Sequence, residues 1–213
     1  MNIINHAALV RMLRGAVAEI RENHEWLSRL DSVGGDGDHG TTMLRAMTKL
    51  EQALEASVSG KMSTLLNDVG WAILGVDGGA TGPLLGMFFV SMAAAVEGLD
   101  ELDAEAFTTA VEAGLAGVRA QTKAEPGDKT LIDALVPAVD ALRVAASSGS
   151  ELLEALYLAA EAAESGAKLT STMQARFGRA RNIKEQSIGT QDPGATSMSL
   201  LFRGFKKGFE DHA

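Results

Sequence analysis

Apolar residues recur every three to four positions along most of the chain, which is the spacing of one face of an α-helix. The stripe is regular from residue 5 to residue 30, and Asn5 is a residue type that caps helix N-termini, as are Asp103 and Asp192 before two later helical stretches. Half-buried β-strands would instead alternate apolar and polar positions, and the chain has no sustained alternation of that kind. The pattern therefore predicts an all-α protein.

The same periodicity divides the chain into eight predicted helices. The fourth is almost entirely apolar and should be buried, and Pro137 predicts a kink in the sixth. Short connections favour an antiparallel bundle, and 213 residues suit a single domain over residues 1–213. The predicted helices cover about residues 5–30, 43–60, 63–74, 84–96, 103–118, 131–142, 150–163 and 192–209.

An unusual cluster of aspartates follows the first predicted helix. Asp31, Asp36 and Asp38 lie within eight residues of one another, on a backbone that contains several glycines. Like charges so close together repel, and hard cations such as Mg²⁺ prefer carboxylate oxygens completed by water and substrate phosphate. We therefore interpret this loop as a metal site that also binds phosphate.

Three other interpretations of the loop are weaker. Residues 35–40 match Gly-x-Gly-x-x-Gly, but a dinucleotide-binding loop follows an apolar strand, whereas this loop follows a helical pattern. An EF-hand loop that began at Asp36 would need glycine at its sixth position, where Thr41 stands. Asp36 or Asp38 could also simply cap the next helix, but a cap leaves the other carboxylates unexplained.

Alternate loops of an antiparallel bundle lie at the same end. Helix N-termini at that end favour phosphate, because they present free N–H groups and a positive dipole end. Threonine hydroxyls and the charges of Lys129 and Arg179 would add contacts to phosphate or ribose, although threonine also caps helices. The loops expected to converge on this nucleotide-type site are residues 31–40, 75–82, 123–129 and 178–191.

Charge and composition narrow the possible partners. The chain has 19 Lys and Arg residues against 28 Asp and Glu residues, a formal net charge of −9. This balance argues against nucleic acid or an anionic membrane as the main partner. The absence of cysteine excludes disulfides and thiolate metal ligands. No segment approaches the roughly 20 apolar residues of a membrane span, so we expect a cytoplasmic protein.

The run Gly-Asp-Gly-Asp-His-Gly-Thr-Thr-Met at residues 35–43 resembles the metal loop of the nucleotide-binding L subunit of bacterial dihydroxyacetone kinases, the DhaL family. Other stretches are similar to family stretches in the same order, and together they span nearly the whole chain. The resemblance implies an eight-helix barrel that holds ADP or ATP across one end with two Mg²⁺ ions. The similar stretches are residues 79–83, 123–130, 173–176, 178–179, 187–189 and 191–197.

The resemblance also implies roles for individual residues. Asp31, Asp36 and Asp38 would bind Mg²⁺, and Arg179 would join them in the catalytic machinery. The phosphates would be held by backbone and hydroxyl groups of His39, Gly40, Thr41, Thr42, Ala80 and Thr81. The nucleoside and ribose would be covered by Thr130, Leu131, Arg179, Asp192, Pro193 and Gly194, with Leu131 packed on adenine.

Two positions depart from the family pattern. Thr81 stands where the family commonly has serine, which keeps the hydroxyl. Residues 180–186 differ from the sequence typical of the dihydroxyacetone enzymes, and this loop belongs to the end that would meet a sugar-bearing subunit. The sugar therefore stays open between dihydroxyacetone and a related short ketose such as an erythrulose.

The sequence is thus interpreted as an ADP- or ATP-binding subunit that transfers a phosphoryl group to a short ketose on a separate K-type subunit. His39 is the one histidine of these loops, where a phosphate role suits it better than a covalent sugar site. A nucleotide-binding regulatory or adaptor protein without transfer activity, and a helical scaffold without a ligand, are the alternatives. The donor stays open between ATP itself and a phosphotransferase-system phosphocarrier that recharges bound ADP.

Overall fold

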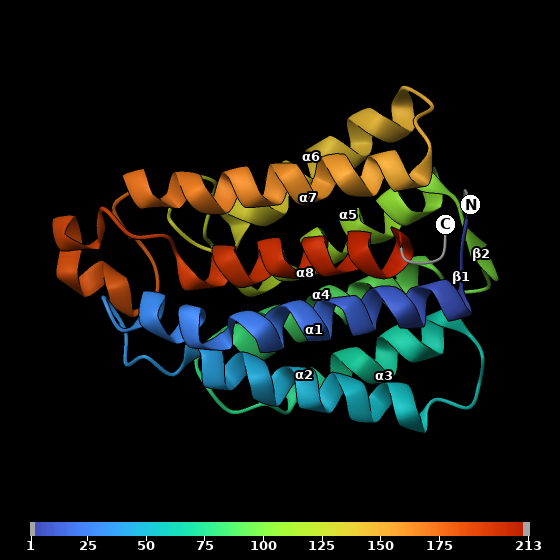
Figure 1. Ribbon diagram of the computed structural model, residues 1–213, viewed down its shortest axis with the longest axis horizontal. Coiled ribbons are helices and arrows are strands. Elements are labelled where there is room, and N and C mark those ends of the chain that lie inside the picture. The colour runs from blue at the N-terminus through green and yellow to red at the C-terminus, as the bar shows by residue number, and fades with distance from the viewer. Residues whose placement is uncertain (1–2, 211–213) are drawn as a thin grey trace.

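The computed structural model describes residues 3–210, and the first two and last three residues of the predicted 1–213 domain lie outside this range. The predicted all-α class is confirmed (Figure 1), since the described residues form eight α-helices, two 3₁₀ segments and one pair of two-residue strands. The helices are α1 His6–Asp31, α2 His39–Ala56, α3 Met62–Leu74, α4 Thr81–Ala95, α5 Ala104–Gln121, α6 Ile132–Ser147, α7 Leu152–Leu169 and α8 Pro193–Glu210. The 3₁₀ segments are η1 Thr170–Thr172 and η2 Arg179–Ser187, and the strands are β1 Ile4–Asn5 and β2 Glu101–Leu102.

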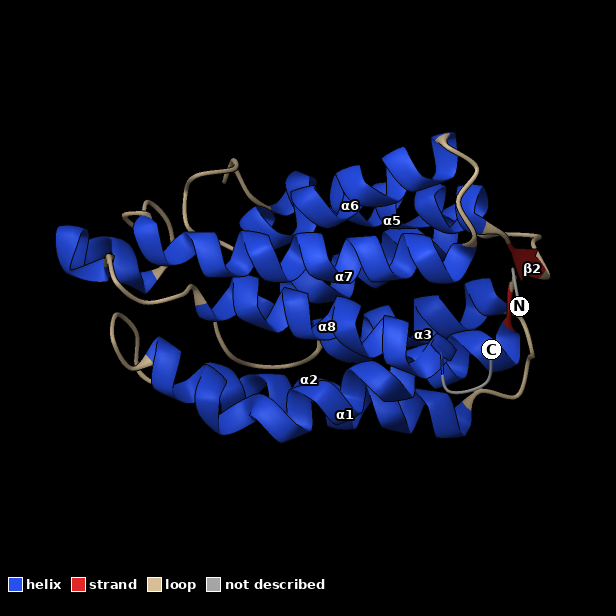
Figure 2. Ribbon diagram, turned by 45° about the horizontal axis from the view of Figure 1, so that its top comes forward, coloured by secondary structure: helices blue, strands red, loops and turns tan. Residues whose placement is uncertain are grey.

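The helices form a closed ring. Each packs against the next one along the chain, and α8 packs against α1. Successive helices run in opposite directions, so the loops alternate between the two ends of the molecule (Figure 1). The antiparallel strands β1 and β2 lie at one end, and η2 protrudes at the other (Figure 2). This arrangement places the four chemically distinctive loops together, as their alternation predicts.

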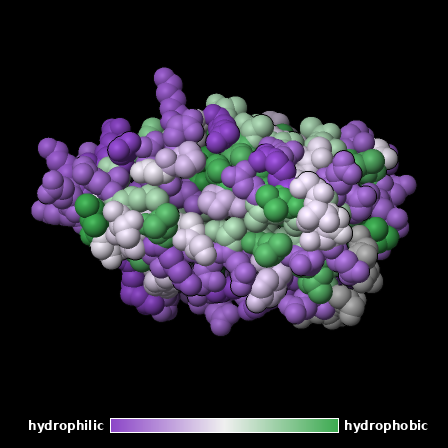
Figure 3. All heavy atoms as spheres, turned by 90° about the horizontal axis from the view of Figure 1, so that it is seen from above, coloured by the Kyte–Doolittle hydropathy of each residue, from purple (hydrophilic) through white to green (hydrophobic). Residues whose placement is uncertain are grey.

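The ring is filled by apolar side chains from every helix. The predicted burial of α4 is confirmed for its inner face, where Phe88 and Phe89 have no exposed surface and pack edge to face with ring centroids 5.3 Å apart, whereas Pro83 and Ala94 are exposed. Burying side chains of this size contributes roughly 1.5–3 kcal/mol each. The outside is mixed, and the end that carries η2 is mostly hydrophilic (Figure 3).

Glycines allow α1 and α8 to approach closely. A Cβ atom on Gly204 of α8 would lie 2.6 Å from the carbonyl carbon of Gly15 in α1, and one on Gly208 would lie 2.7 Å from the Cα atom of Met12. Beside this contact the Glu19 carboxylate is buried and pairs with Arg203 and Lys207 of α8. We call this contact between α1 and α8 the glycine seam, and it closes the ring.

Side chains define several helix ends as the sequence predicts. The Asn5 side chain accepts the N–H of Ala8 at 3.0 Å, and Asp103 accepts the N–H of Ala106 at 2.8 Å. The predicted start of the fourth helix near Pro83 was late, because α4 already begins at Thr81. The predicted kink at Pro137 does not interrupt α6, which continues as one helix through that residue. Within residues 3–210, no helix is long and apolar enough to cross a membrane.

Gly204→Ala should lower the free energy of unfolding by about 2 kcal/mol, because the added methyl group must push the backbones of α1 and α8 apart. Gly75→Ala is the matched control, because Gly75 has φ −79° and its Cβ would meet no neighbouring atom closer than 3.7 Å. Urea unfolding followed by circular dichroism measures both. Equal stability of the Gly204 variant and the wild type would show that the seam is loosely packed.

Candidate functional site

A cavity of about 350 Å³ opens at the end of the ring where the four loops meet. Its volume lies within the range of small-molecule sites. All four loops contribute to its wall, which confirms that the alternation of loops brings them together. Asp36, Gly40 and Thr41 do not line the cavity. The predicted site residues that line it are Asp31, Asp38, His39, Thr42, Ala80, Thr81, Thr130, Leu131, Arg179, Asp192, Pro193 and Gly194.

The three aspartates converge beside this cavity. Asp31, Asp36 and Asp38 each place one carboxylate oxygen within 4.8 Å of the others. The Asp31 carboxylate also accepts the backbone N–H of His39 at 3.3 Å. Gly35 makes this possible, because a Cβ at that position would lie 2.8 Å from the Asp31 carboxyl carbon. Asp38 precedes α2 but makes no side-chain cap, so its interpretation as a simple helix cap is wrong.

Arg179 meets the aspartate cluster from η2. Its guanidinium pairs with Asp36 and lies 3.9 Å from Asp38. Desolvation opposes ionisation of Asp36, but the hydrogen bond with Asp38 and the charge of Arg179 lower its pKa. Desolvation and the neighbouring Asp36 raise the pKa of Asp38. The cluster is therefore only partly neutralised by protein groups, and its oxygen donors fit a hard divalent cation such as Mg²⁺.

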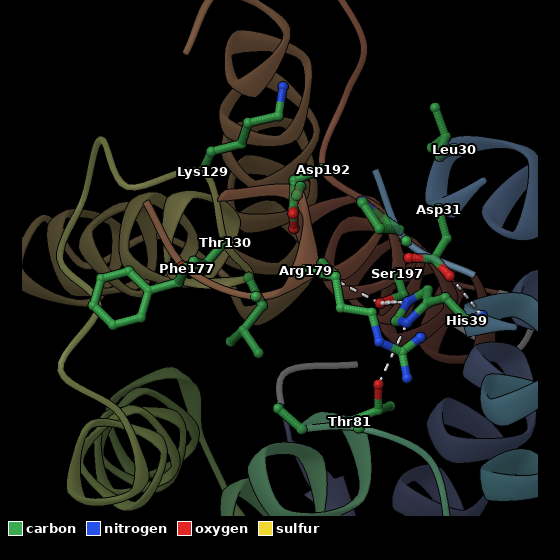
Figure 4. Close-up of a pocket in the computed structure, with 18 of the residues that line it drawn as sticks. Leu30, Asp31, His39, Thr81, Lys129, Thr130, Phe177, Arg179, Asp192 and Ser197 are labelled. Carbon is green, nitrogen blue, oxygen red and sulfur yellow. Dashed lines mark hydrogen bonds between the residues drawn. The ribbon is translucent and has the colours of Figure 1, made fainter. Parts of the chain in front are cut away.

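The His39 ring joins three helices at the cavity wall. Its Nε2 lies 3.2 Å from the Ser197 hydroxyl of α8, and its Nδ1 lies 3.3 Å from the Thr81 hydroxyl of α4 (Figure 4). Burial lowers the pKa of the ring, which favours neutral imidazole with one donor and one acceptor nitrogen. Both ring nitrogens are engaged, so the ring positions the hydroxyls rather than offering a free charge.

Ser197 is a site residue that sequence reasoning did not identify. It lies one turn inside α8, at a position that the helical pattern describes only as buried. Its hydroxyl donates to the carbonyl of Gly194 at 3.0 Å and meets the His39 ring. Its place in the stretch at residues 191–197, which resembles the DhaL family, is the signal that could have identified it.

The predicted threonines divide into two kinds. The Thr130 hydroxyl accepts the N–H of Ile132 at 3.2 Å, so Thr130 acts as a turn and cap residue as well as part of the wall. The Thr42 hydroxyl accepts a hydrogen bond from Arg45 at 3.1 Å and is buried. Thr81 instead presents its hydroxyl to the His39 ring inside the cavity. Only Thr81 therefore has its predicted hydroxyl aimed into the site.

Part of the cavity wall is apolar. Leu84, Leu131 and Phe177 line the cavity, and Figure 4 shows Phe177 on the side away from Asp31 and His39. Phe177 was not predicted, because an aromatic residue in an irregular segment has no periodic pattern around it. A cavity with carboxylates at one side and an apolar wall at the other suits a ligand with a charged end and a flat apolar end.

Lys129 does not have its predicted role at phosphate. Its side chain is 4% exposed and its ammonium donates to the carbonyl oxygens of Thr170, Ser187 and Thr190. Figure 4 shows the side chain pointing away from Asp31, His39 and Arg179. The prediction failed because the sequence gives the charge of a side chain and not its direction.

Asp192 begins α8 as predicted. Its carboxylate accepts the N–H of Ala195 at 2.7 Å, and its own N–H donates to the Thr170 hydroxyl at 2.8 Å. Desolvation raises the pKa of Asp192 to about 7, although the Ala195 N–H and the charge of Lys129 both oppose this shift. The group therefore titrates near neutral pH at the edge of the cavity.

A family model described as the DAK2 domain matches residues 33–207. The chain is 41% identical over 179 residues to the ADP-binding subunit DhaL of the PEP-dependent dihydroxyacetone kinase of Escherichia coli, covering 84% of this chain and 85% of that one. It is 37% identical to L-erythrulose 1-kinase of Mycolicibacterium smegmatis, covering 85% of this chain and 32% of that enzyme.

Solved structures give the same likeness. The dihydroxyacetone kinase of C. freundii in complex with AMP-PNP and Mg²⁺ aligns with a TM-score of 0.73 and 26% identity. The alignment covers 97% of this chain and 34% of that one, so the chain spans about a third of that enzyme.

Asp192→Asn should change how stability depends on pH. In the unfolded chain an aspartate has a pKa of about 3.9, so the folded protein, with its pKa of about 7, binds the proton more tightly. The carboxyl group therefore contributes stability at low pH that is lost as pH rises from about 4 to 7, by at most about 1.4 kcal/mol per pH unit. The asparagine variant should lack this loss.

Denaturant unfolding between pH 5 and pH 8 tests this expectation. The free energy of unfolding of the wild type minus that of Asp192→Asn should fall as pH rises. Asp68→Asn, an exposed aspartate on α3, is the control and should give no such trend. A difference that stays flat or increases with pH would mean that Asp192 is already ionised in the folded protein at pH 5.

Proposed function

Because this chain belongs to the DAK2-domain family, we propose that it is the nucleotide-binding subunit of a dihydroxyacetone-type kinase. In this proposal residues 1–213 form one nucleotide-binding domain that holds ADP or ATP with Mg²⁺, two ions in all. A phosphoryl group passes to a short ketose, dihydroxyacetone or an erythrulose-like sugar, that is held on a separate K-type subunit.

One observation carries the proposal. Three carboxylate oxygens lie within 4.8 Å of one another beside a cavity that also has apolar side chains in its wall, among them Leu84, Leu131 and Phe177. A triphosphate or diphosphate needs a cation between it and such carboxylates, and an adenine ring needs an apolar surface. Few other ligand classes combine both requirements.

The chain's own residues divide the work as follows. Asp31, Asp36 and Asp38 hold Mg²⁺, which when bound neutralises phosphate charge and polarises the transferring group. The N-terminus of α2, at His39, Gly40 and Thr41, lies beside the aspartate cluster, where its positive dipole end favours phosphate bridged to the carboxylates by the cation. The residues that complete the nucleotide site are Thr42, Ala80, Thr81, Thr130, Leu131, Asp192, Pro193 and Gly194.

Arg179 supplies the charge nearest to the reacting phosphoryl group. Its guanidinium already reaches Asp36 and Asp38, so a phosphate bridged to these carboxylates through a cation would lie within its range. Phosphoryl transfer depends on positioning and on stabilisation of charge over the phosphoryl oxygens, and an arginine does both. Arg179 is therefore assigned a catalytic role.

The names of the relatives support the choice of partners. The E. coli relative is a subunit of a PEP-dependent kinase, and a relative in Lactococcus lactis is named as PTS-dependent. We therefore propose a K-type subunit as the sugar-bearing partner, with the phosphoryl group supplied either by ATP or by a phosphotransferase-system phosphocarrier that recharges bound ADP. The pairing of Arg179 with the aspartates favours transfer over an adaptor role, because a protein that only senses nucleotide has no need of this arrangement.

Calorimetric titration with ADP tests the nucleotide site directly. Binding should be measurable with Mg²⁺ and lost when EDTA removes the cation. Binding of equal strength in EDTA would contradict the assignment of the aspartate cluster to the nucleotide site. No binding in either condition would contradict the nucleotide site itself.

Asp38→Asn should abolish Mg²⁺-dependent ADP binding, with a loss of at least about 100-fold in affinity, because one of three charged ligands is lost. Its free energy of unfolding should stay the same or rise, since one carboxylate leaves a repulsive cluster. Asp36→Asn should abolish binding as well but also removes the partner of Arg179. Asp68→Asn is the exposed control. An unchanged ADP affinity in either cluster variant contradicts the metal assignment.

The purified chain should not phosphorylate free dihydroxyacetone with ATP and Mg²⁺, and activity should appear only when a K-type subunit is added. The reason is that the sugar is held on the partner in the proposed reaction. Formation of dihydroxyacetone phosphate measures this. Asp38→Asn mixed with the same partner controls for activity carried over with the partner. Turnover by the chain alone would contradict the proposal that the sugar is held on the K-type subunit.

A further inference from the structure

Lys129 is a buried cation that the proposed reaction does not use. Its side chain is 4% exposed, and its ammonium donates to the carbonyls of Thr170 at 2.9 Å, Ser187 at 2.6 Å and Thr190 at 2.5 Å. A lysine ammonium has three N–H donors, so each is used once. The Asp192 carboxylate offsets the charge from nearby.

The three carbonyl acceptors lie at the two ends of a single segment of the chain. We call residues 170–192, which lead from α7 to α8, the connecting segment. Thr170 is where the segment leaves α7, and Ser187 and Thr190 are where it returns. Two more hydrogen bonds join these ends, from Gly189 N–H to the Ser171 carbonyl at 2.8 Å and from Asp192 N–H to the Thr170 hydroxyl at 2.8 Å. Lys129 therefore binds both ends of the connecting segment where they meet.

The connecting segment carries Arg179 at its far side. The connecting segment projects beyond the end of the ring as η2 (Figure 1). Ser187 is the buried residue of η2, so η2 has little apolar packing of its own. A second tie comes from the residue before Lys129, because the Arg176 N–H donates to the Asp128 carbonyl at 3.2 Å. The position of Arg179 over Asp36 therefore depends on ties made at residues 128 and 129.

The backbone at Lys129 adds an independent observation. Its φ is +61°, a left-handed conformation that is strained for a non-glycine residue. A glycine would adopt this conformation at lower cost. An apolar side chain would fill the interior without the cost of burying a charge. A lysine that bears both costs is explained by what its ammonium holds.

We propose that Lys129 is a positioning residue, which joins both ends of the connecting segment and thereby sets the place of Arg179 over the aspartate cluster. The same residue precedes Thr130 and Leu131 in the cavity wall, so it ties the wall and the connecting segment into one unit. The structural part of this proposal stands on geometry alone, and its kinetic consequence rests on the proposed function.

Amide hydrogen exchange measured by NMR tests the structural part without any activity. Lys129→Met, which keeps the length of the side chain and removes the charge, should raise exchange at the Gly189 and Asp192 amides at least tenfold. Amides inside α1 and α4 should keep their wild-type rates. Lys168→Met is the matched control, because that lysine is exposed on α7 and pairs with Glu164 in a surface contact. Unchanged exchange at Gly189 and Asp192 overturns the proposal.

Raised exchange inside α1 and α4 would show that Lys129→Met destabilises the whole fold. In that case exchange at the Gly189 and Asp192 amides is measured in Lys129→Gln, which retains a hydrogen-bond donor without the charge. Lys129→Arg should restore most of the protection, because it keeps a cation with several donors. Exchange in Lys129→Arg as fast as in Lys129→Met would mean that shape, and not the donated hydrogen bonds, holds the segment.

A double-mutant cycle with Arg179→Gln tests the kinetic part in the presence of the K-type subunit. Lys129→Met should lower kcat at least tenfold and change the KM for nucleotide less than threefold. In the Arg179→Gln background it should have almost no further effect, because its contribution passes through Arg179. Additive losses overturn the positioning role. If the wild type shows no transfer with any partner, the proposed function fails while the exchange result still decides the structural part.

Discussion

Three carboxylates that repel one another are held within 4.8 Å, and the rest of the structure serves to keep them there. A loop alone could not do this, because flexible backbone would relax until the charges separated. The loop is fixed at one side by α1 and α2 and at the other by Arg179 from the connecting segment. Both depend on the closed ring, since the connecting segment starts from α7 and returns to α8, and α8 packs on α1 through the glycine seam. The stability of the core is thus used to maintain an unfavourable cluster at one end.

Polar residues around the cluster act mainly on one another. The His39 ring contacts the hydroxyls of Thr81 and Ser197, and the Lys129 ammonium donates to three carbonyls, so the polar groups of both side chains are already engaged within the protein. Such preorganised groups lose little entropy when a ligand arrives, which is the physical advantage of a rigid site over a flexible one. The site therefore combines carboxylates and Arg179, whose charges can meet a ligand, with hydrogen-bonded side chains such as His39 that hold their neighbours in place.

The fold class and the convergence of four loops could be predicted from the sequence, because helical periodicity and the alternation of antiparallel helices are local and regular properties. Asn5, Asp103 and Asp192 could be predicted as caps for the same reason, since each acts on residues three positions away. Lys129 could not, because its acceptors lie 41 to 61 residues further along the chain. The closure of the ring by Gly15 and Gly204 was also invisible, since a glycine within a helical pattern does not reveal which backbone approaches it.

The glycine seam gives the chain an unusual order of events during folding. It joins α1 to α8, which nearly all of the described chain separates, so it forms only when the two ends of the described chain meet. Until α8 arrives, α1 presents a flat strip of backbone, and Glu19 lacks the cations that neutralise it. Before α8 packs on it, this surface of α1 can also bind the α8 helix of a second molecule. An exchange of α8 between two molecules would satisfy every contact of the seam. Closure of the seam within one chain therefore competes with exchange of α8 between two chains.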